Sequence, residues 1–198
     1  MHEERRKNMI TREVLYFLKP GPENTENCLN LLDKAVDMGF RHLVVASTTG
    51  ASGAQAAVRL EASPDVNLVV VGHSVGFKGP NIDEFLEEHH QAISSRGGKV
   101  LKATILTHSL DTALAEQFKG VANTLIIANT LRRLGQGLKV CCEIVMEAVD
   151  AGLIPEGEEV VAAGGTARGW DTVALIRSAA SKRFLQLAVL EIWAKPRG

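Results

Sequence analysis

A run of hydroxyl side chains and two glycines is the first segment that could do chemistry: Ser47-Thr48-Thr49-Gly50-Ala51-Ser52-Gly53. It follows the apolar run 43–46 and precedes a helical pattern. Free N–H groups at a helix start, together with short hydroxyl donors, suit an anion such as phosphate. The segment predicts a phosphate-binding loop, although the same residue types are also ordinary helix caps. No lysine accompanies it at the spacing of a triphosphate-binding loop, so triphosphate hydrolysis is not expected.

A second glycine-rich loop, Gly164-Gly165-Thr166-Ala167-Arg168-Gly169-Trp170-Asp171, follows the apolar run 160–163. Arg168 offers a guanidinium fork to a phosphate, Thr166 offers a donor, and Trp170 offers a flat ring on which a ligand ring could stack. The alternative is a surface turn with Trp170 folded back onto the core. The two loops can converge only if their strands are neighbours.

The middle loop contains Gly72-His73-Ser74-Val75-Gly76, which matches the Gly-x-Ser-x-Gly pattern of a nucleophile elbow. An elbow passes directly from strand to helix, whereas Gly79-Pro80 delays the next helix to about Asn81. No histidine lies beyond Asp111 to complete the usual order of serine, acid and histidine. We therefore favour a binding loop, with His73, Ser74 and Phe77 facing the crevice, over a serine hydrolase.

Histidine is the side chain that titrates near neutral pH, and two histidines are candidates for proton transfer. His73 and His108 each lie just past a predicted strand, so both could face one pocket. His89 and His90 are adjacent in a predicted helix and point about 100° apart, so they do not form a metal pair. No metal site is expected.

Length, composition and charge limit the kinds of protein that this chain can be. The chain has 198 residues, 45% hydrophobic and 23% charged, which predicts one globular domain over residues 1–198. A net charge of -1 gives no overall basic field for nucleic acid, and no apolar run approaches the roughly 20 residues of a membrane span. Residues 1 to about 11 predict a flexible extension without a secretory signal. The three cysteines, Cys28, Cys141 and Cys142, predict buried core residues in a reducing compartment, and we expect a cytoplasmic protein.

Strand and helix patterns alternate along the chain. This order predicts an α/β fold, a three-layer α/β/α sandwich with a mainly parallel sheet, in which ligands bind at the carboxyl ends of the strands. The final strand alternates apolar and polar residues, which indicates an edge or antiparallel position. The predicted strands are 14–18, 43–46, 67–71, 100–106, 159–163 and 185–194, and the predicted helices are 25–36, 52–60, 82–93, 110–118, 121–134, 138–151 and 171–180.

Four segments together resemble one known family. Asn24-Thr25-Glu26, VVASTTGASG, GQGLKVCCEIVMEAVDAGLIP and GGTARGWDT are similar to stand-alone proteins related to the C-terminal α/β domain of pyruvate kinase, from about Leu15 to Pro196. In pyruvate kinase the corresponding loop holds a phosphate of a sugar bisphosphate activator, and Ser47, Thr49 and Ser52 match its hydroxyl positions. The kinase active site belongs to a barrel domain that 198 residues cannot contain, so pyruvate kinase activity is not expected.

The resemblance implies flavin mononucleotide (FMN) as the ligand. The Ser47 to Gly53 loop would hold its phosphate, and Gly72, His73, Phe77, Gly165, Thr166 and Trp170 would surround the ribityl chain and ring. Three functions stay open: binding of FMN or another phosphorylated small molecule, catalysis in the same pocket, and a regulatory effector-binding module. Catalysis would be flavin-dependent oxidation and reduction, or phosphoryl or acyl transfer. A homo-oligomer is a further possibility.

Overall fold

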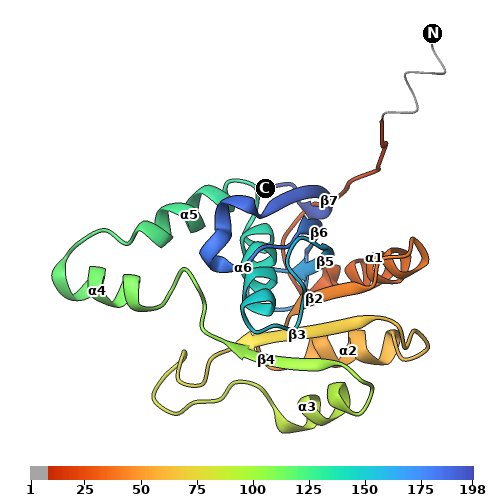
Figure 1. Cartoon of the computed structure of the whole chain (residues 1–198), viewed down its shortest axis with the longest axis horizontal. Helices are drawn as coiled ribbons and strands as arrows, with labels where there is room; N and C mark the ends of the chain where they lie inside the picture. The colour runs from red at the N-terminus through yellow and green to blue at the C-terminus, as the bar shows by residue number, and fades with distance from the viewer. Residues whose placement is uncertain (1–8) are drawn as a thin grey trace.

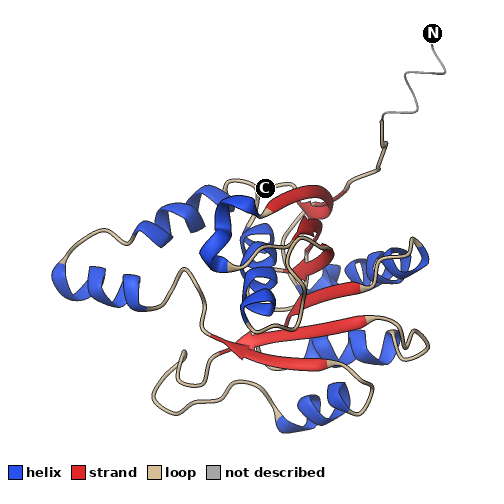
Figure 2. Cartoon of the chain, viewed as in Figure 1, coloured by secondary structure: helices blue, strands red, loops and turns tan. Residues whose placement is uncertain are grey.

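The computed structural model describes residues 9–198, so the predicted N-terminal extension lies mostly outside the described residues. Helices and strands alternate as the sequence predicts (Figures 1 and 2). The strands are β1 (Leu15–Phe17), β2 (His42–Ala46), β3 (Asn67–His73), β4 (Lys99–Ala103), β5 (Glu159–Gly164), β6 (Thr172–Arg177) and β7 (Ala188–Pro196). The helices are α1 (Thr25–Asp37), α2 (Ala51–Arg59), α3 (Glu87–Ser94), α4 (Leu110–Phe118), α5 (Asn123–Arg132) and α6 (Gln136–Asp150), with short 3-10 helices η2 (Pro22–Asn24) and η3 (Ser181–Gln186).

The seven strands form one sheet in the order β1-β7-β6-β5-β2-β3-β4. β2 pairs in parallel with both β3 and β5, β3 pairs in parallel with β4, and β1 pairs in parallel with β7. Only β6 is antiparallel to its neighbours. The chain runs outward from β2 to β4 and then returns through α4, α5 and α6 to the other side of β2. A ligand crevice in such a sheet is expected where this direction changes, at the carboxyl ends of β2 and β5.

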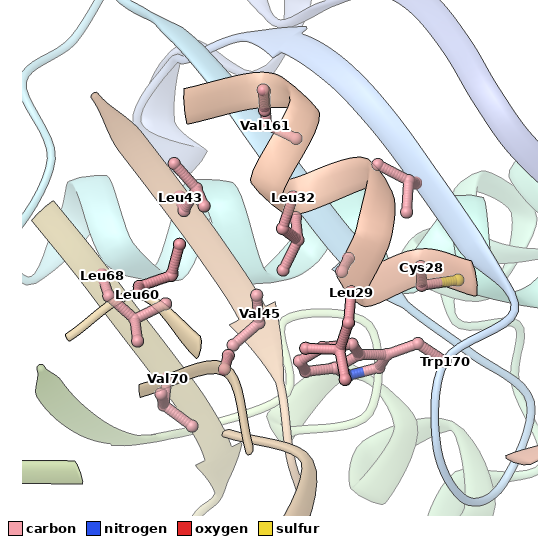
Figure 3. Packing of buried hydrophobic residues seen from close by; sticks show 14 of the residues in the cluster. Cys28, Leu29, Leu32, Leu43, Val45, Leu60, Leu68, Val70, Val161 and Trp170 are labelled. Carbon is pink, nitrogen blue, oxygen red and sulfur yellow. The ribbon is translucent and has the colours of Figure 1, made fainter. Parts of the chain in front are cut away.

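Helices cover both faces of the sheet, so the predicted three-layer α/β/α arrangement is confirmed. α1, α2 and α3 pack on one face through Leu32 and Ile93, against Leu43 and Val70 of the sheet. Figure 3 shows this face, with Trp170 beside Leu29 of α1. α6 packs on the opposite face through a second apolar cluster. Strands covered on both faces need no polar side chains, which explains the continuous apolar runs of β2, β3 and β5.

The helix predicted for residues 171–180 is wrong, because residues Thr172–Arg177 form strand β6. β6 lies between β5 and β7, and its residues from Thr172 to Ile176 are all buried. A fully buried run has no hydrophobic periodicity, so the pattern cannot separate a strand from a buried helix. The antiparallel position predicted for the last strand is confirmed, although β1 rather than β7 forms the edge.

Candidate functional site

The first and last glycine-rich loops do converge. β2 and β5 are direct neighbours, so Ser47 and Gly165 follow strands that end side by side. The indole Nε1 of Trp170 donates a hydrogen bond of 2.6 Å to the carbonyl oxygen of Ala46, which joins the two loops at their base. The two loops could share a site only if their strands were neighbours, and β2 and β5 are neighbours.

The loop that leads into α2 has donors without protein partners. Ser47 Oγ accepts a hydrogen bond from the N–H of Gly53, in the first turn of α2, at 3.3 Å, although the N-cap residue of this helix is Gly50. The N–H groups of Ala51 and Ser52 donate to no acceptor among residues 9–198. The hydroxyls of Thr48, Thr49 and Ser52 also make no hydrogen bond with that part of the chain, and Thr49 is exposed. The loop therefore combines one hydroxyl that accepts from the first turn of α2 with donors that have no partner among residues 9–198, at the positive end of the helix dipole.

The glycines of the first and middle loops have a packing role that the sequence did not reveal. A Cβ on Gly50 would lie 2.6 Å from the Cβ of His89, and a Cβ on Gly72 would lie 2.7 Å from the Phe85 ring. A Cβ on Gly53 would collide with the Val70 side chain. Gly50 also has φ +90°, which disfavours other residues. These three positions are small so that α2, α3 and the sheet can approach one another.

His89 is a site residue that the sequence analysis missed. Its Nδ1 donates to the carbonyl oxygen of Thr49 at 2.9 Å, so the histidine supports the backbone of the Ser47–Gly53 loop. A groove of about 490 Å³ runs along α2 from His89 to Arg59. Arg59 is paired with Glu26 at 2.6 Å and with Asp33 at 3.2 Å, so its charge is already balanced. The strands β2 and β3 are neighbours, which brings α3 against α2 and His89 against the loop before α2. The role of His89 therefore depends on the strand order and not on a local sequence pattern.

The middle loop places His73 and Phe77 together. Nδ1 of His73 lies 3.0 Å from Oε2 of Glu84, and the His73 and Phe77 ring centroids are 4.7 Å apart. Phe77 is 44% exposed, so one face of this pair is open to a ligand. β3 ends at His73 and α3 begins only at Glu87, later than the predicted start at residue 82. Ser74 therefore does not lie on a strand-to-helix elbow, and the choice of a binding loop is consistent with this geometry.

Trp170 does not offer a ring to a ligand. Its side chain is 0% exposed and packs in the core with α1, and its backbone N–H donates to Thr25 Oγ1 at 3.0 Å. The prediction of a stacking surface at Trp170 is wrong, and the alternative of a ring folded onto the core is correct. The physical reason is that Gly169 packs directly on Pro22 and Thr25, which turns the next residue inward.

Arg168 and Thr166 remain at the surface of the last loop. The Arg168 side chain is exposed and forms neither a hydrogen bond nor an ion pair with residues 9–198. The Thr166 N–H donates to Oδ2 of the buried Asp171 at 3.1 Å, which fixes the turn. A Cβ on Gly165 would collide with the carbonyl oxygen of Gly169, so this glycine closes the loop. Arg168 is thus an exposed cation, without a side-chain partner among residues 9–198, on the loop that follows β5, the strand next to β2.

A buried charged network surrounds the second candidate histidine. Thr107 Oγ1 donates to Oε1 of Glu143 at 2.6 Å, and the Thr107 N–H donates to the same oxygen at 3.0 Å. Lys139 pairs with the other oxygen of Glu143, and both side chains are almost fully buried. His108 Nδ1 lies 2.9 Å from Thr107 Oγ1, which has given its own proton to Glu143, so Nδ1 is the donor. This tautomer leaves the His108 Nε2 lone pair free.

Burial lowers the pKa of His108 below its ordinary value, and the positive charge of Lys139 acts in the same direction. Burial, together with the charge of Glu143, raises the pKa of Glu147 to about 8. Lys139, Glu143 and Glu147 recur every four residues on the buried helix α6. Charged residues at this spacing in an apolar helix were the sequence signal for the network. His73 and His108 have different neighbours, so the pocket predicted to join them is not supported by shared contacts.

The three cysteines are buried as predicted. Burial raises the pKa of Cys28 and Cys142 to about 12 and that of Cys141 well above its ordinary value. Within residues 9–198, no three histidine, cysteine or acidic side chains are grouped so as to hold a metal ion. None of the helices in that range has the length and apolar content needed to cross a membrane. No protein-family model matches this chain.

Proposed function

We propose that this protein binds a phosphorylated small molecule at the carboxyl ends of β2 and β5. The observation that carries the proposal is the set of unpartnered donors at the start of α2, next to the strand whose loop bears the unpaired Arg168. The N–H groups of Ala51 and Ser52 and the nearby hydroxyls would take the phosphate oxygens. Arg168 would add a charge-assisted contact to the same group.

FMN is the ligand we propose to test first. The resemblance to the stand-alone relatives of the pyruvate kinase C-terminal domain supports it, as does the open aromatic pair of His73 and Phe77. Phe77 replaces Trp170 as the proposed contact of the isoalloxazine ring, since only Phe77 is exposed. In this arrangement Trp170 holds the loops in place and the middle loop receives the ring.

The test begins with the visible absorption spectrum of the tag-free protein and with mass identification of any molecule released on unfolding. FMN and then other sugar and nucleotide phosphates are titrated by calorimetry. Arg168→Ala should weaken phosphate-dependent binding about 10-fold or more, because a charge-assisted hydrogen bond contributes about 1.5–3 kcal/mol. Ser52→Ala should weaken binding by a smaller factor without altering the fold.

Arg177→Ala is the matched control, because Arg177 is also exposed but lies at the opposite end of the sheet. Gly50 is unsuitable for this test, since any side chain there would collide with His89 and Phe85. Equal loss of affinity in the Arg168 and Arg177 variants would reject the proposed phosphate site. Failure of FMN alone, with another phosphate compound bound, would reject the flavin and keep the site.

Proton transfer at His108 is a second candidate function, favoured by one observation. His108 has a lowered pKa and a fixed tautomer with a free Nε2, which are the properties of a general base near neutral pH. The variant His108→Gln belongs in the same titrations. On this reading it retains ligand binding and loses turnover of the bound compound, whereas Arg168→Ala loses binding itself.

A further inference from the structure

Arg132, the last residue of α5, has no acidic partner within residues 9–198, where the ion pairs of arginine involve other arginines. Its Nε donates to Gln136 Oε1 at 2.7 Å, and its Nη1 donates to Asn129 Oδ1 at 2.9 Å. Both acceptors are neutral amides. A guanidinium has five N–H groups, so these bonds fix its position and leave the others without a partner in that range.

One side of α6 connects Arg132 to His108. Gln136 and Glu143 are separated by about two turns of α6, so they lie on the same side of the helix. Gln136 binds Arg132, while Glu143 binds Thr107, whose hydroxyl lies 2.9 Å from His108 Nδ1. Arg132 and His108 are therefore brought to this side of α6 by two different segments. Both residues are partly exposed to solvent, so a small molecule can reach them.

The surroundings of His108 carry an excess of positive charge. Burial is the main cause that lowers the pKa of His108, the charges of Lys139 and Arg132 lower it further, and the charge of Glu143 opposes them. Lys139 and Glu143 form a buried ion pair and so balance each other. Burial raises the pKa of Glu147, the next acid on α6, to about 8, so this group is mostly neutral at pH 7. Arg132 is the charge that these groups leave unbalanced.

The acids of α4 do not balance Arg132 either. The Asp111 carboxylate accepts hydrogen bonds from the N–H and Oγ1 of Thr124, both at 2.9 Å. Thr124 lies in the first turn of α5, whereas Arg132 lies at the other end of that helix. Glu116 lines a groove between α4 and α5 and makes no ion pair within residues 9–198.

We infer that Arg132 and His108 form a binding site for an oxyanion, the carboxylate or phosphate group of a small molecule. The unpartnered N–H groups of Arg132 would take two oxygens as a fork, which is the geometry that arginine uses for both anions. His108 would take up a proton from solvent at Nε2 and donate it in a hydrogen bond to the same group. α6 and α2 cover opposite faces of the sheet, so this site does not depend on the phosphate site proposed at α2.

Nuclear magnetic resonance of the histidine Hε1–Cε1 groups tests the inference at the site itself. Inorganic phosphate and acetate are titrated separately at constant ionic strength, and His108→Gln identifies the His108 signal. At least one probe should shift this signal saturably and raise the pKa of His108, because a bound anion favours the imidazolium form. The probe that binds more tightly identifies the anion as a phosphate or a carboxylate.

Arg132→Gln should raise the dissociation constant of the probe about 10-fold or more, because it removes the charge-assisted fork. Arg133→Gln is the matched control, since Arg133 is the next residue, is exposed, and forms no side-chain bond within residues 9–198. It removes the same charge and should change the constant by less than about twofold, because solvent screens an exposed charge. Arg132→Lys keeps the charge without the fork and should give an intermediate constant. Circular dichroism shows whether each variant is folded.

Arg168→Ala separates this inference from the site proposed at α2. It should leave the response of His108 unchanged, whatever it does to binding at the α2 loop. A His108 signal that responds to neither probe, or drifts without saturating, would overturn the inference. Equal weakening in the Arg132 and Arg133 variants would also overturn it, because the response would then report an adventitious ion only. Unchanged binding in both Arg132 variants would overturn it as well.

Discussion

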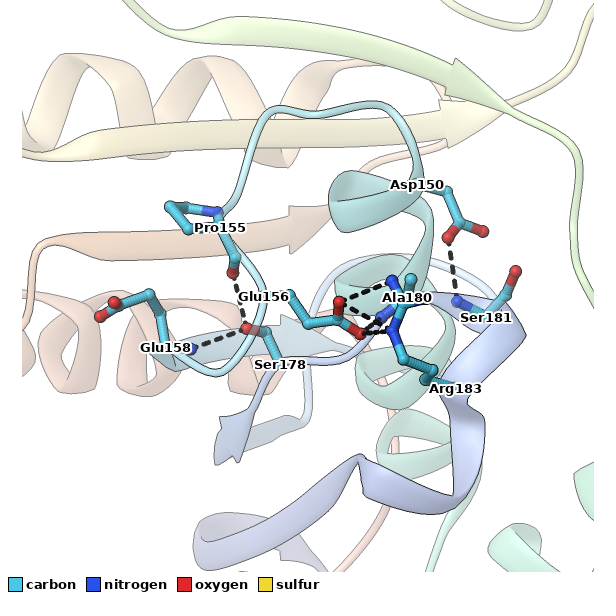
Figure 4. Close-up of polar contacts among 8 residues, drawn as sticks. All are labelled: Asp150, Pro155, Glu156, Glu158, Ser178, Ala180, Ser181 and Arg183. Carbon is cyan, nitrogen blue, oxygen red and sulfur yellow. Dashed lines mark hydrogen bonds and ion pairs between the residues drawn. The ribbon is translucent and has the colours of Figure 1, made fainter.

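Two networks of charged side chains lie at the two ends of α6, and they are built in opposite ways. At the start of the helix, Lys139 and Glu143 are buried under the segment that carries Thr107 and His108. At its end, Asp150 receives the Ser181 N–H at 2.9 Å, and Glu156 binds Arg183 and the Ala180 N–H at the surface (Figure 4). The buried network lies towards the carboxyl ends of the strands, and the exposed one lies at the amino end of β5.

The comparison separates two uses of ion pairs. In the exposed network Ser178 Oγ also donates to Pro155 O and accepts from the Glu158 N–H, so side chains bond several backbone groups of the turn between α6 and β5. This network holds a surface turn in place. The buried network includes His108, whose tautomer leaves the lone pair on Nε2. The buried network therefore shares the carboxyl-terminal end of the sheet with the candidate site, whereas the exposed network lies at the other end.

The largest effect should come from Lys139→Met. This change leaves the Glu143 carboxylate buried without its cation, which typically costs about 3–5 kcal/mol of unfolding free energy. Urea unfolding followed by circular dichroism measures the loss. Adding Glu143→Gln should recover part of it, because the amide still accepts from Thr107 and carries no charge. A double variant no more stable than the single one would contradict the assignment of the cost to an unpaired charge.

Glu147 should make stability depend on pH. Its pKa is raised from 4.5 to about 8 in the folded protein, so the folded chain keeps a proton that the unfolded chain releases. The stabilising contribution is complete below about pH 4.5 and is lost as pH rises to about 8, on the order of 1 kcal/mol per pH unit. Glu143, Lys139 and Asp150 surround this group. Denaturant midpoints between pH 5 and pH 8 give the slope, and Glu147→Gln should flatten it.

The smallest effect should come from Arg183→Ala in the exposed network. The Arg183 guanidinium lowers the pKa of Glu156, but both side chains are open to solvent, which screens such pairs. We expect a shift in the urea midpoint well below that of Lys139→Met, and a shift that disappears in high salt. A loss comparable with that of Lys139→Met would remove the contrast between the two ends of α6.

Most of the fold could be predicted because amphipathic helices and buried parallel strands leave different patterns. Leu110–Phe118 was predicted with its observed bounds, and α2 and β5 were predicted within one residue. β6 was missed because a strand buried on both faces and flanked by antiparallel neighbours loses the alternation that identifies it. The start of α3 was placed too early because Ile82 and Phe85 fit a helical spacing, although Phe85 instead packs against the two loop glycines.

The site could be predicted only in part. The position of the loops at the strand ends followed from the order of elements, and the convergence of the first and last loops followed once β2 and β5 were neighbours. The inward turn of Trp170 depends on contacts with Pro22 and Thr25, which lie about 145 residues earlier in the chain. The role of His89 likewise depends on which helices and loops become neighbours. Tertiary contacts of this kind leave no mark on local spacing.

The buried indole of Trp170 gives the protein an optical reporter. The chain contains two tryptophans, and the second, Trp193 of β7, packs beside Phe40. Trp170 Nε1 is bonded to the residue immediately before Ser47, so its fluorescence is sensitive to any shift of that backbone. A flavin held nearby would also quench this emission by energy transfer. Trp170 is unavailable for stacking, but its fluorescence can report a change in the conformation of the neighbouring loop without any added label.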